Sequence, residues 1–232
     1  MVSALIVAAG KGTRMGRNID KLFLEVAGRP VVAHTWAQFE RTKEIGEVIL
    51  VVREGMEPAF RDLQKRFGFN KPVKLVAGGE ERQDSVWNGL SALSNESEIV
   101  AIQDAARPCA RQQLISATIE TARHHGAAVA AHPVTDTLKE SSDGQVIERT
   151  IDRSKIWAVQ TPQTFRVEII RRAMVEVRQR GLVLTDDTAA CELIGQPVHL
   201  VTGFGPNPKV TRPEDLAYIE LLLKAEAPLV NV

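Results

Sequence analysis

The stretch VSALIVAAGKGTRMG, residues 2–16, decides the fold, because a short apolar run ends abruptly in a glycine-rich loop. The loop carries Gly10, Gly12 and Gly16 together with two cations, one of them Arg14. Glycines leave backbone amides open to close approach, and the cations indicate that the approaching group is anionic. The glycine spacing matches neither the P-loop nor the dinucleotide-binding fingerprint. The stretch therefore predicts a buried strand followed by a phosphate-binding loop of another type.

Similar apolar runs recur along the chain, at residues 2–9, 47–53, 73–78, 98–104 and 127–134. Each is nearly continuous rather than alternating, which is typical of strands buried on both faces of a parallel sheet. Segments with apolar residues three and four apart lie between them and predict helices. The alternation predicts an α/β fold, a doubly wound and mostly parallel sheet of the Rossmann-like kind.

The pattern changes after Pro133, where β-prone residues lie on either side of Asp143 and Gly144. An Asp-Gly pair is a strong signal for a hairpin turn. We expect a β-hairpin arm at about residues 133–157, inserted in a single domain of residues 1–232. An isolated hairpin is marginally stable in water, so the arm has to dock on something.

The composition excludes several classes of protein. Lys and Arg number 29, as do Asp and Glu, so no bulk charge favours nucleic acid or an anionic membrane. Cys109 and Cys191 lie far apart, which is typical of a reduced protein without a disulfide framework. No apolar run reaches the roughly 18 residues that a membrane span needs. We expect a soluble, cytoplasmic protein.

Later motifs identify a family. The glycine loop, then Lys21 and LFLEVAGRPVVAHT, resembles the signature of the nucleotide-sugar pyrophosphorylase class of nucleotidyltransferases. Six further motifs narrow the resemblance: GGEERQDSV (78–86), DAARP (104–108), PVTDTLK (133–139), TIDRSKIWAVQTPQTF (150–165), TDDTA (185–189) and NPKVTRPEDL (207–216). In this order they resemble the 2-C-methyl-D-erythritol 4-phosphate cytidylyltransferases of the non-mevalonate isoprenoid pathway. One departure is Gln103, which precedes DAARP where many members have His.

The resemblance implies transfer of CMP from CTP to a sugar-alcohol phosphate, with pyrophosphate leaving and no covalent enzyme intermediate. It gives the catalytic role to cations, because such a transfer needs positioning and charge neutralisation. These cations are Arg14, Lys21 and Lys209. It assigns nucleotide binding to a set of mostly small residues: Ala8, Ala9, Gly10, Gly12, Gly79, Glu80, Ser85, Asp104 and Ala105.

The resemblance also implies the acceptor and metal sites. The residues assigned to binding the acceptor and its phosphate are Arg107, Thr137, Arg153, Thr161 and Lys209. Mg²⁺ is the expected cofactor, bridged largely by nucleotide phosphates and contacted, directly or indirectly, by Asp104. Because Thr137 and Arg153 lie at the two ends of the arm, we expect a homodimer in which each arm completes the neighbour's site.

Two alternatives stay open at this point. A ribitol 5-phosphate cytidylyltransferase differs only in its acceptor, and Ala9, where that family more often has glycine, favours methylerythritol phosphate weakly. A catalytically silent nucleotide-binding protein on the same scaffold would not need the acceptor-site cations. Asp186 and Asp187 are interpreted as a helix cap and a first-turn acid, and the orientation of Lys209 stays open as a further role for them.

Overall fold

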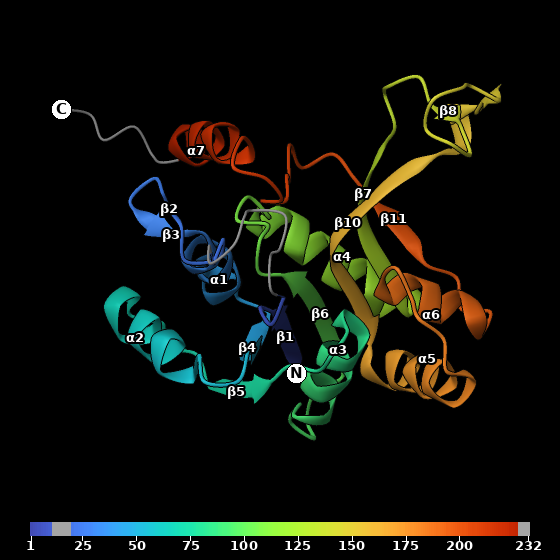
Figure 1. Cartoon of the computed structure of the whole chain (residues 1–232). Helices are drawn as coiled ribbons and strands as arrows, with labels where there is room; N and C mark the ends of the chain where they lie inside the picture. Colours follow the sequence, from blue (N-terminus) through green and yellow to red (C-terminus); the bar gives the residue numbers. More distant parts are fainter. Residues whose placement is uncertain (11–19, 227–232) are drawn as a thin grey trace.

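The computed structural model describes residues 1–10 and 20–226, which build one seven-stranded sheet flanked by helices (Figure 1). The strand order is β11-β7-β10-β6-β1-β4-β5. The strands span Val2–Val7 (β1), Ile45–Val52 (β4), Val73–Ala77 (β5), Ile99–Asp104 (β6), Ala127–Pro133 (β7), Trp157–Arg166 (β10) and His199–Val201 (β11). All neighbouring strands are parallel except β10, which runs antiparallel to both β6 and β7. The predicted doubly wound, mostly parallel sheet is confirmed.

Helices cover both faces of this sheet. They span Val31–Arg41 (α1), Glu57–Phe67 (α2), Arg82–Ser91 (α3), Gln112–His125 (α4), Val167–Arg180 (α5), Asp187–Leu193 (α6) and Asp215–Glu226 (α7). Apolar side chains of α1, α2, α4 and α7 pack in one core, and those of α3, α5 and α6 pack in another. None of these helices is long and apolar enough to cross a membrane.

The central strand β1 explains why the apolar runs are continuous. Ala4 and Ile6 face the first core, whereas Leu5 faces the second, so successive side chains of one strand are buried on opposite faces. In register, Val7 lies opposite Val51 of β4 and Asp104 of β6. The carboxyl ends of three parallel strands therefore meet at one edge of the sheet, the edge where α/β proteins bind ligands.

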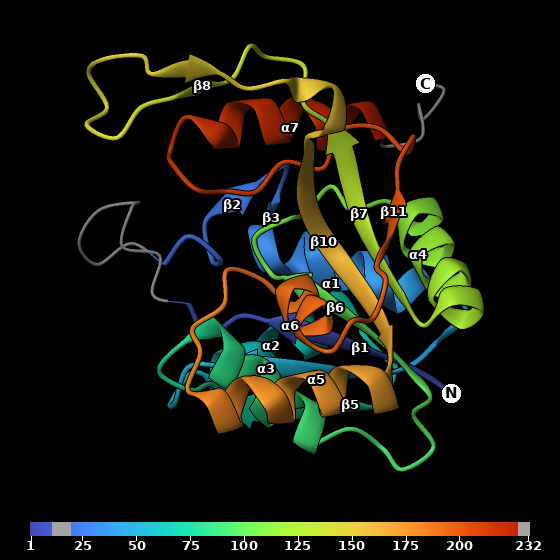
Figure 2. The same cartoon turned by 90° about the vertical axis from the view of Figure 1, so that its right-hand side faces the viewer.

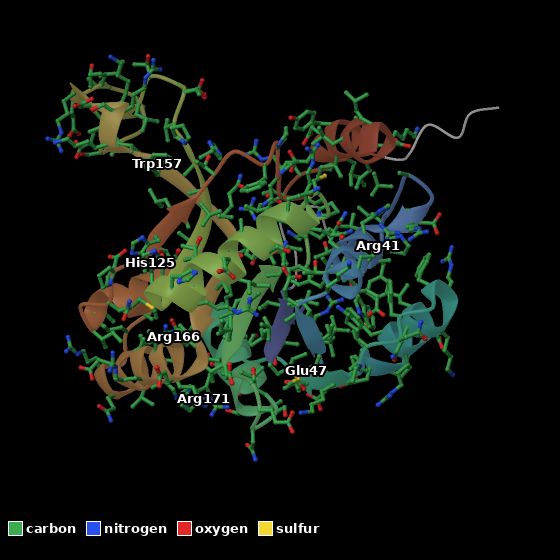
Figure 3. The ribbon with its side chains drawn as sticks, turned by 180° about the vertical axis from the view of Figure 1, so that it is seen from behind. Arg41, Glu47, His125, Trp157, Arg166 and Arg171 are labelled. Atoms are coloured by element: carbon green, nitrogen blue, oxygen red, sulfur yellow. The ribbon has the colours of Figure 1, made fainter. Side chains whose placement is uncertain are left out.

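The arm is present and projects from the body of the molecule (Figures 1 and 2). Its two short strands, β8 (Lys139–Glu140) and β9 (Arg149–Thr150), pair with each other, and a turn around Asp143 and Gly144 is part of the longer connection between them. A short 3₁₀ helix, η2 (Arg153–Lys155), leads back to β10. Seen from behind, Trp157 lies where β10 leaves the arm (Figure 3).

A small hairpin, β2 (Glu25–Val26) and β3 (Arg29–Pro30), precedes α1. Ala27 and Gly28 form its turn with φ of 45° and 76°, so the glycine supplies a conformation that other residues rarely adopt. Pro30 is the residue before the first turn of α1.

Candidate active site

A pocket of about 590 Å³ opens at the carboxyl edge of β1 and β6. Its lining contains most of the residues predicted to bind nucleotide: Ala8, Ala9, Gly10, Gly79, Glu80, Ser85, Asp104 and Ala105. Lys21 and Lys209, two of the three predicted catalytic cations, line the same pocket. The third, Arg14, lies outside the described residues together with Gly12. Residues from four separate motifs thus line one pocket.

The backbone wall of the pocket depends on close packing between loops. The amide of Ala8 donates to the carbonyl of Val51 at 2.7 Å, which fixes the chain as it leaves β1. On the opposite side the Gly79 amide donates to the buried Ser85 hydroxyl at 3.1 Å. A Cβ at Gly79 would lie 2.3 Å from the Cβ of Asp84, so glycine is required there. Backbone amides and carbonyls at such a wall can recognise a planar base.

Asp104 is the electrostatic centre of the pocket. Its carboxylate accepts from the Lys209 ammonium at 2.6 Å and from Nε of Arg82 at 3.3 Å, and Nε of Arg107 lies 3.7 Å away. Burial alone would raise the pKa of Asp104, but the charges of Arg82 and Lys209 outweigh burial and lower it to about 2. Asp104 is therefore ionised throughout the physiological pH range.

Hydrogen bonds hold the remaining loops around Asp104. The Asp104 amide donates to the buried Thr161 hydroxyl at 3.1 Å, and the Asn207 amide group donates to the Thr161 carbonyl at 2.7 Å. Arg107 donates to the Asn207 carbonyl at 2.7 Å. Lys21 donates to the carbonyl of Val210, also at 2.7 Å. These bonds tie Thr161, Arg107 and the 207–210 segment to the loops around Asp104, and of these residues Lys209 lines the pocket itself.

Gln103, the departure from the family pattern, is fully buried beneath this cluster. Its side-chain amide donates to the Arg107 carbonyl at 3.2 Å. It supports the loop that carries Arg107 and does not line the pocket.

Two predicted acceptor residues lie elsewhere in this chain. Thr137 and Arg153 are exposed on the arm and take no part in lining the pocket. The Arg153 guanidinium donates to the carbonyl of Thr135 within the arm. The single chain thus does not bring these two residues to its own pocket.

Arg82 lines the pocket and is absent from the residues predicted from the sequence. It is the first residue of α3 and bridges Asp104 to Asp187, whose carboxylate lies 2.8 Å from its Nη2. Asp187 is buried in α6, and Asp186 beside it caps that helix by accepting from the Ala189 amide at 3.1 Å. The cap prediction is confirmed for Asp186. Lys209, by contrast, is held by Asp104 and not by either residue of this pair.

The described residues offer no cluster of three or more His, Cys, Asp or Glu side chains arranged to hold a metal ion. Asp104 is the buried carboxylate of the pocket, and both of its oxygens face cations. This donor set fits a metal that is carried largely by the nucleotide phosphates and contacts the protein through at most one carboxylate.

Comparisons of the sequence with a family model and with known proteins indicate the same family. The model of the family 2-C-methyl-D-erythritol 4-phosphate cytidylyltransferase (IspD) matches residues 2–225. The enzyme of that name from Pelotomaculum thermopropionicum is 43% identical over 225 residues, which cover 97% of this chain and 94% of that protein. The one from Geobacillus kaustophilus is 44% identical over 220 residues, covering 95% and 96%.

Solved structures agree. The 4-diphosphocytidyl-2C-methyl-D-erythritol synthase of Anaerococcus prevotii superimposes with a TM-score of 0.84 at 32% identity, covering 96% of each chain. Fold, pocket and similarity together define a cytidylyltransferase of the nucleotidyltransferase class. The chain belongs to the 2-C-methyl-D-erythritol 4-phosphate cytidylyltransferase family.

Proposed function

We propose that this chain transfers CMP from CTP to 2-C-methyl-D-erythritol 4-phosphate, giving 4-diphosphocytidyl-2-C-methyl-D-erythritol and pyrophosphate. The convergence of the two glycine loops with Lys21, Asp104 and Lys209 on one pocket carries the proposal. An oxygen of the acceptor phosphate attacks the α-phosphorus of CTP, the bond to the β-phosphate oxygen breaks, and that oxygen leaves with pyrophosphate.

The base and the triphosphate occupy different parts of the pocket in this proposal. The backbone at Ala8 and Ala9 and at Gly79 and Glu80, with the Ser85 hydroxyl, reads the amino group and carbonyl of cytosine. Small residues suit this task because the base has to lie against the main chain. Asp104 and Ala105 hold the ribose at the end of β6, and Gly10 contributes a backbone amide to the phosphates.

Lys21 and Lys209 neutralise charge on the phosphoryl groups. Lys209 belongs to the 207–210 segment, and Lys21 lies beside that segment because it donates to the Val210 carbonyl. Arg14 and Gly12, outside the described residues, are proposed to join them at the triphosphate. Replacing Lys21 by alanine should lower turnover about a hundred- to a thousand-fold, the cost of removing one preorganised charge donor. Lys224→Ala, at an exposed lysine of α7 paired with Glu220, is the matched control and should leave turnover unchanged.

Mg²⁺ is proposed as the cofactor, with Asp104 as its one protein contact. When bound, the ion supplies charge neutralisation at the phosphates. Arg107, Thr161 and Lys209 are proposed to bind the acceptor, because hydrogen bonds tie all three to the loops around Asp104.

The first test measures pyrophosphate release from CTP with Mg²⁺, comparing 2-C-methyl-D-erythritol 4-phosphate with ribitol 5-phosphate at equal concentration. A strong preference for the methylerythritol compound supports the proposal. A preference for ribitol phosphate would refute the acceptor and leave the nucleotide chemistry standing. Tight CTP binding without turnover on either acceptor would favour a silent binding protein.

The arm favours a homodimer with a shared site. Val146 and Ile147 are adjacent apolar side chains near its tip, 65% and 61% exposed, and offer an apolar contact for a second subunit. We propose that Thr137 and Arg153 enter the neighbour's pocket and bind its acceptor phosphate.

Subunit exchange tests this arrangement. A Lys21→Ala dimer and an Arg153→Ala dimer are each expected to be inactive. After exchange, half of the dimers are mixed and each holds one intact site, so about a quarter of wild-type activity should return. Verified exchange without recovery would show that the arm serves its own chain.

A further inference from the structure

The motif TDDTA places two carboxylates side by side, and the structure gives them different partners. Asp186 caps α6 through the Ala189 amide and also accepts from the Thr188 hydroxyl at 2.7 Å. Asp187 is 2% exposed, and its carboxylate lies 2.8 Å from Nη2 of Arg82. Asp186 therefore caps a helix, whereas the carboxylate of Asp187 contacts a residue of the pocket.

Arg82 connects this buried acid to the pocket. Its Nη2 faces Asp187 while its Nε faces Oδ1 of Asp104 at 3.3 Å, so one planar guanidinium bridges two carboxylates. Burial disfavours its charged form, yet the two acids together raise the pKa of Arg82 above its usual value. A fixed fork of this kind orients both partners, which a lysine cannot do.

The bridge continues to the second oxygen of Asp104. That oxygen, Oδ2, accepts from the Lys209 ammonium at 2.6 Å. Charges thus alternate from α6 to the pocket in the order Asp187, Arg82, Asp104 and Lys209. Asp187 itself does not line the pocket, while the other three do.

We infer that Asp187 is a positioning residue for the transfer reaction, which holds Arg82 so that Arg82 in turn holds Asp104 with Oδ2 toward Lys209. This inference rests on the proposed function. The three contacts, Asp187 to Arg82, Arg82 to Asp104 and Asp104 to Lys209, are all ionic contacts between named atoms.

Stability alone does not account for a charge at this place. A buried ion pair often contributes little, because desolvation offsets the attraction, and replacing the whole pair by apolar residues of similar volume is often as stable. The burial of Asp187 raises its pKa, and the Arg82 guanidinium opposes that rise. The helix also does not need this carboxylate, because Asp186 caps it and the Asp187 amide donates to Gln163 at 3.0 Å. What the carboxylate adds is the orientation of Arg82.

The experiment compares Asp187→Asn with Asp186→Asn in the full-length protein. Asparagine is as good a cap as aspartate, so the second substitution changes the neighbouring charge and keeps the helix start. For Asp187→Asn we expect kcat to fall about tenfold or more, in the range of coupling between contacting charged groups, with KM for CTP changing less than about twofold. Asp186→Asn should keep kcat within about twofold of wild type. Equal effects of the two substitutions would overturn the inference.

A double-mutant cycle with Arg82→Lys separates positioning from a loss of fold. Lysine retains the charge but cannot bridge two carboxylates, so Arg82→Lys should reproduce the loss of kcat seen in Asp187→Asn. The double variant should be no slower than the slower single variant, because both remove the same bridge. If the two losses multiply, Asp187 does not act through Arg82.

If the Asp187→Asn protein folds poorly, the Arg82→Lys variant still tests the inference, because the inference requires that Arg82→Lys alone lowers kcat. An unchanged kcat in a folded Arg82→Lys protein refutes the inference. Failure of the proposed function would be seen separately, as a wild-type protein that releases no pyrophosphate from CTP with either acceptor.

Discussion

Replacing Asp104 by asparagine removes one charge and keeps the shape of the side chain, so its effect on stability can be worked out from the structure. The surrounding Arg82 and Lys209 lower the pKa of Asp104 from the ordinary 3.8 to about 2. That difference corresponds to about 2 to 3 kcal/mol of folding free energy carried by the ionised form. Because asparagine resembles the protonated acid, Asp104→Asn should lose this amount at pH 7. For a domain of this size, the loss lowers Tm by about 5 to 10 °C.

The pH dependence has a definite sign. A carboxyl whose pKa is lowered on folding stabilises the protein above its ordinary pKa, and this contribution is lost as the pH falls through the folded value. The difference between wild type and Asp104→Asn should therefore be largest near neutral pH, fall to about half by pH 3 and vanish below about pH 2.

Urea unfolding from pH 7 to pH 3 measures this difference directly. Asp62→Asn, at an exposed position of α2, is the matched control and should change stability by less than about 0.5 kcal/mol at every pH. A difference between wild type and Asp104→Asn that stays constant across the range would refute the reasoning, because a neutral packing defect does not titrate.

Three further predictions follow from packing. A Cβ at Gly89 would lie 2.7 Å from Cδ1 of Leu5, so Gly89→Ala should lower the free energy of unfolding by about 1 to 3 kcal/mol in urea titrations. A Cβ at Gly78 would lie 2.3 Å from the Cβ of Ala9, so Gly78→Ala should weaken CTP binding measured by calorimetry. An unchanged affinity would show that the base binds elsewhere. Burial raises the pKa of Cys191 to about 12, so iodoacetamide at pH 8 should alkylate the folded protein at least about a hundred times more slowly than the urea-unfolded chain.

Most of the sheet could be predicted because its signal is local. Each parallel strand is a short apolar run, and each helix carries apolar residues at helical spacing, so composition within a few residues is enough. The turn at Asp143 and Gly144 is equally local, and the arm was found from it. Its paired length was not evident, since pairing beyond two residues on each side depends on what the polar flanks contact.

The antiparallel strand β10 shows where local signals fail. Its sequence mixes polar and apolar residues, because Gln163 and Thr164 are buried through hydrogen bonds and not through apolar contact. Its neighbours in the sheet, β6 and β7, both precede it in the chain. The sequence of residues 157–166 therefore does not indicate that the strand inserts between these two.

The site was predictable in its motifs and not in its ion pairs. The motif resemblance names Lys21, Asp104 and Lys209, and the structure places all three at one pocket. Arg82 lies inside one of those motifs, yet its partners are a strand end and a helix far along the chain. Ionic partners leave no periodicity in a sequence, so the sequence indicates a first-turn acid or a partner of Lys209 at Asp187, and does not indicate the contact with Arg82.

The arrangement around Asp104 explains how a chain with no net charge can still bind a triphosphate. Arg82, Arg107 and Lys209 face the carboxylates of Asp104 and Asp187, and Lys21 adds a fourth cation at the same pocket. Four positive charges gather around two carboxylates here, and Glu80 and Glu81 also line the pocket, so the positive charge is confined to the surroundings of Asp104 and no field spreads over the surface. In the proposed reaction, a phosphate that binds Lys209 has to compete with the Asp104 carboxylate, and the bridge through Arg82 keeps that carboxylate in place when Lys209 turns to the phosphate. On this proposal the two acids, Asp104 in the pocket and Asp187 behind it, hold the cations in order until the substrate replaces them.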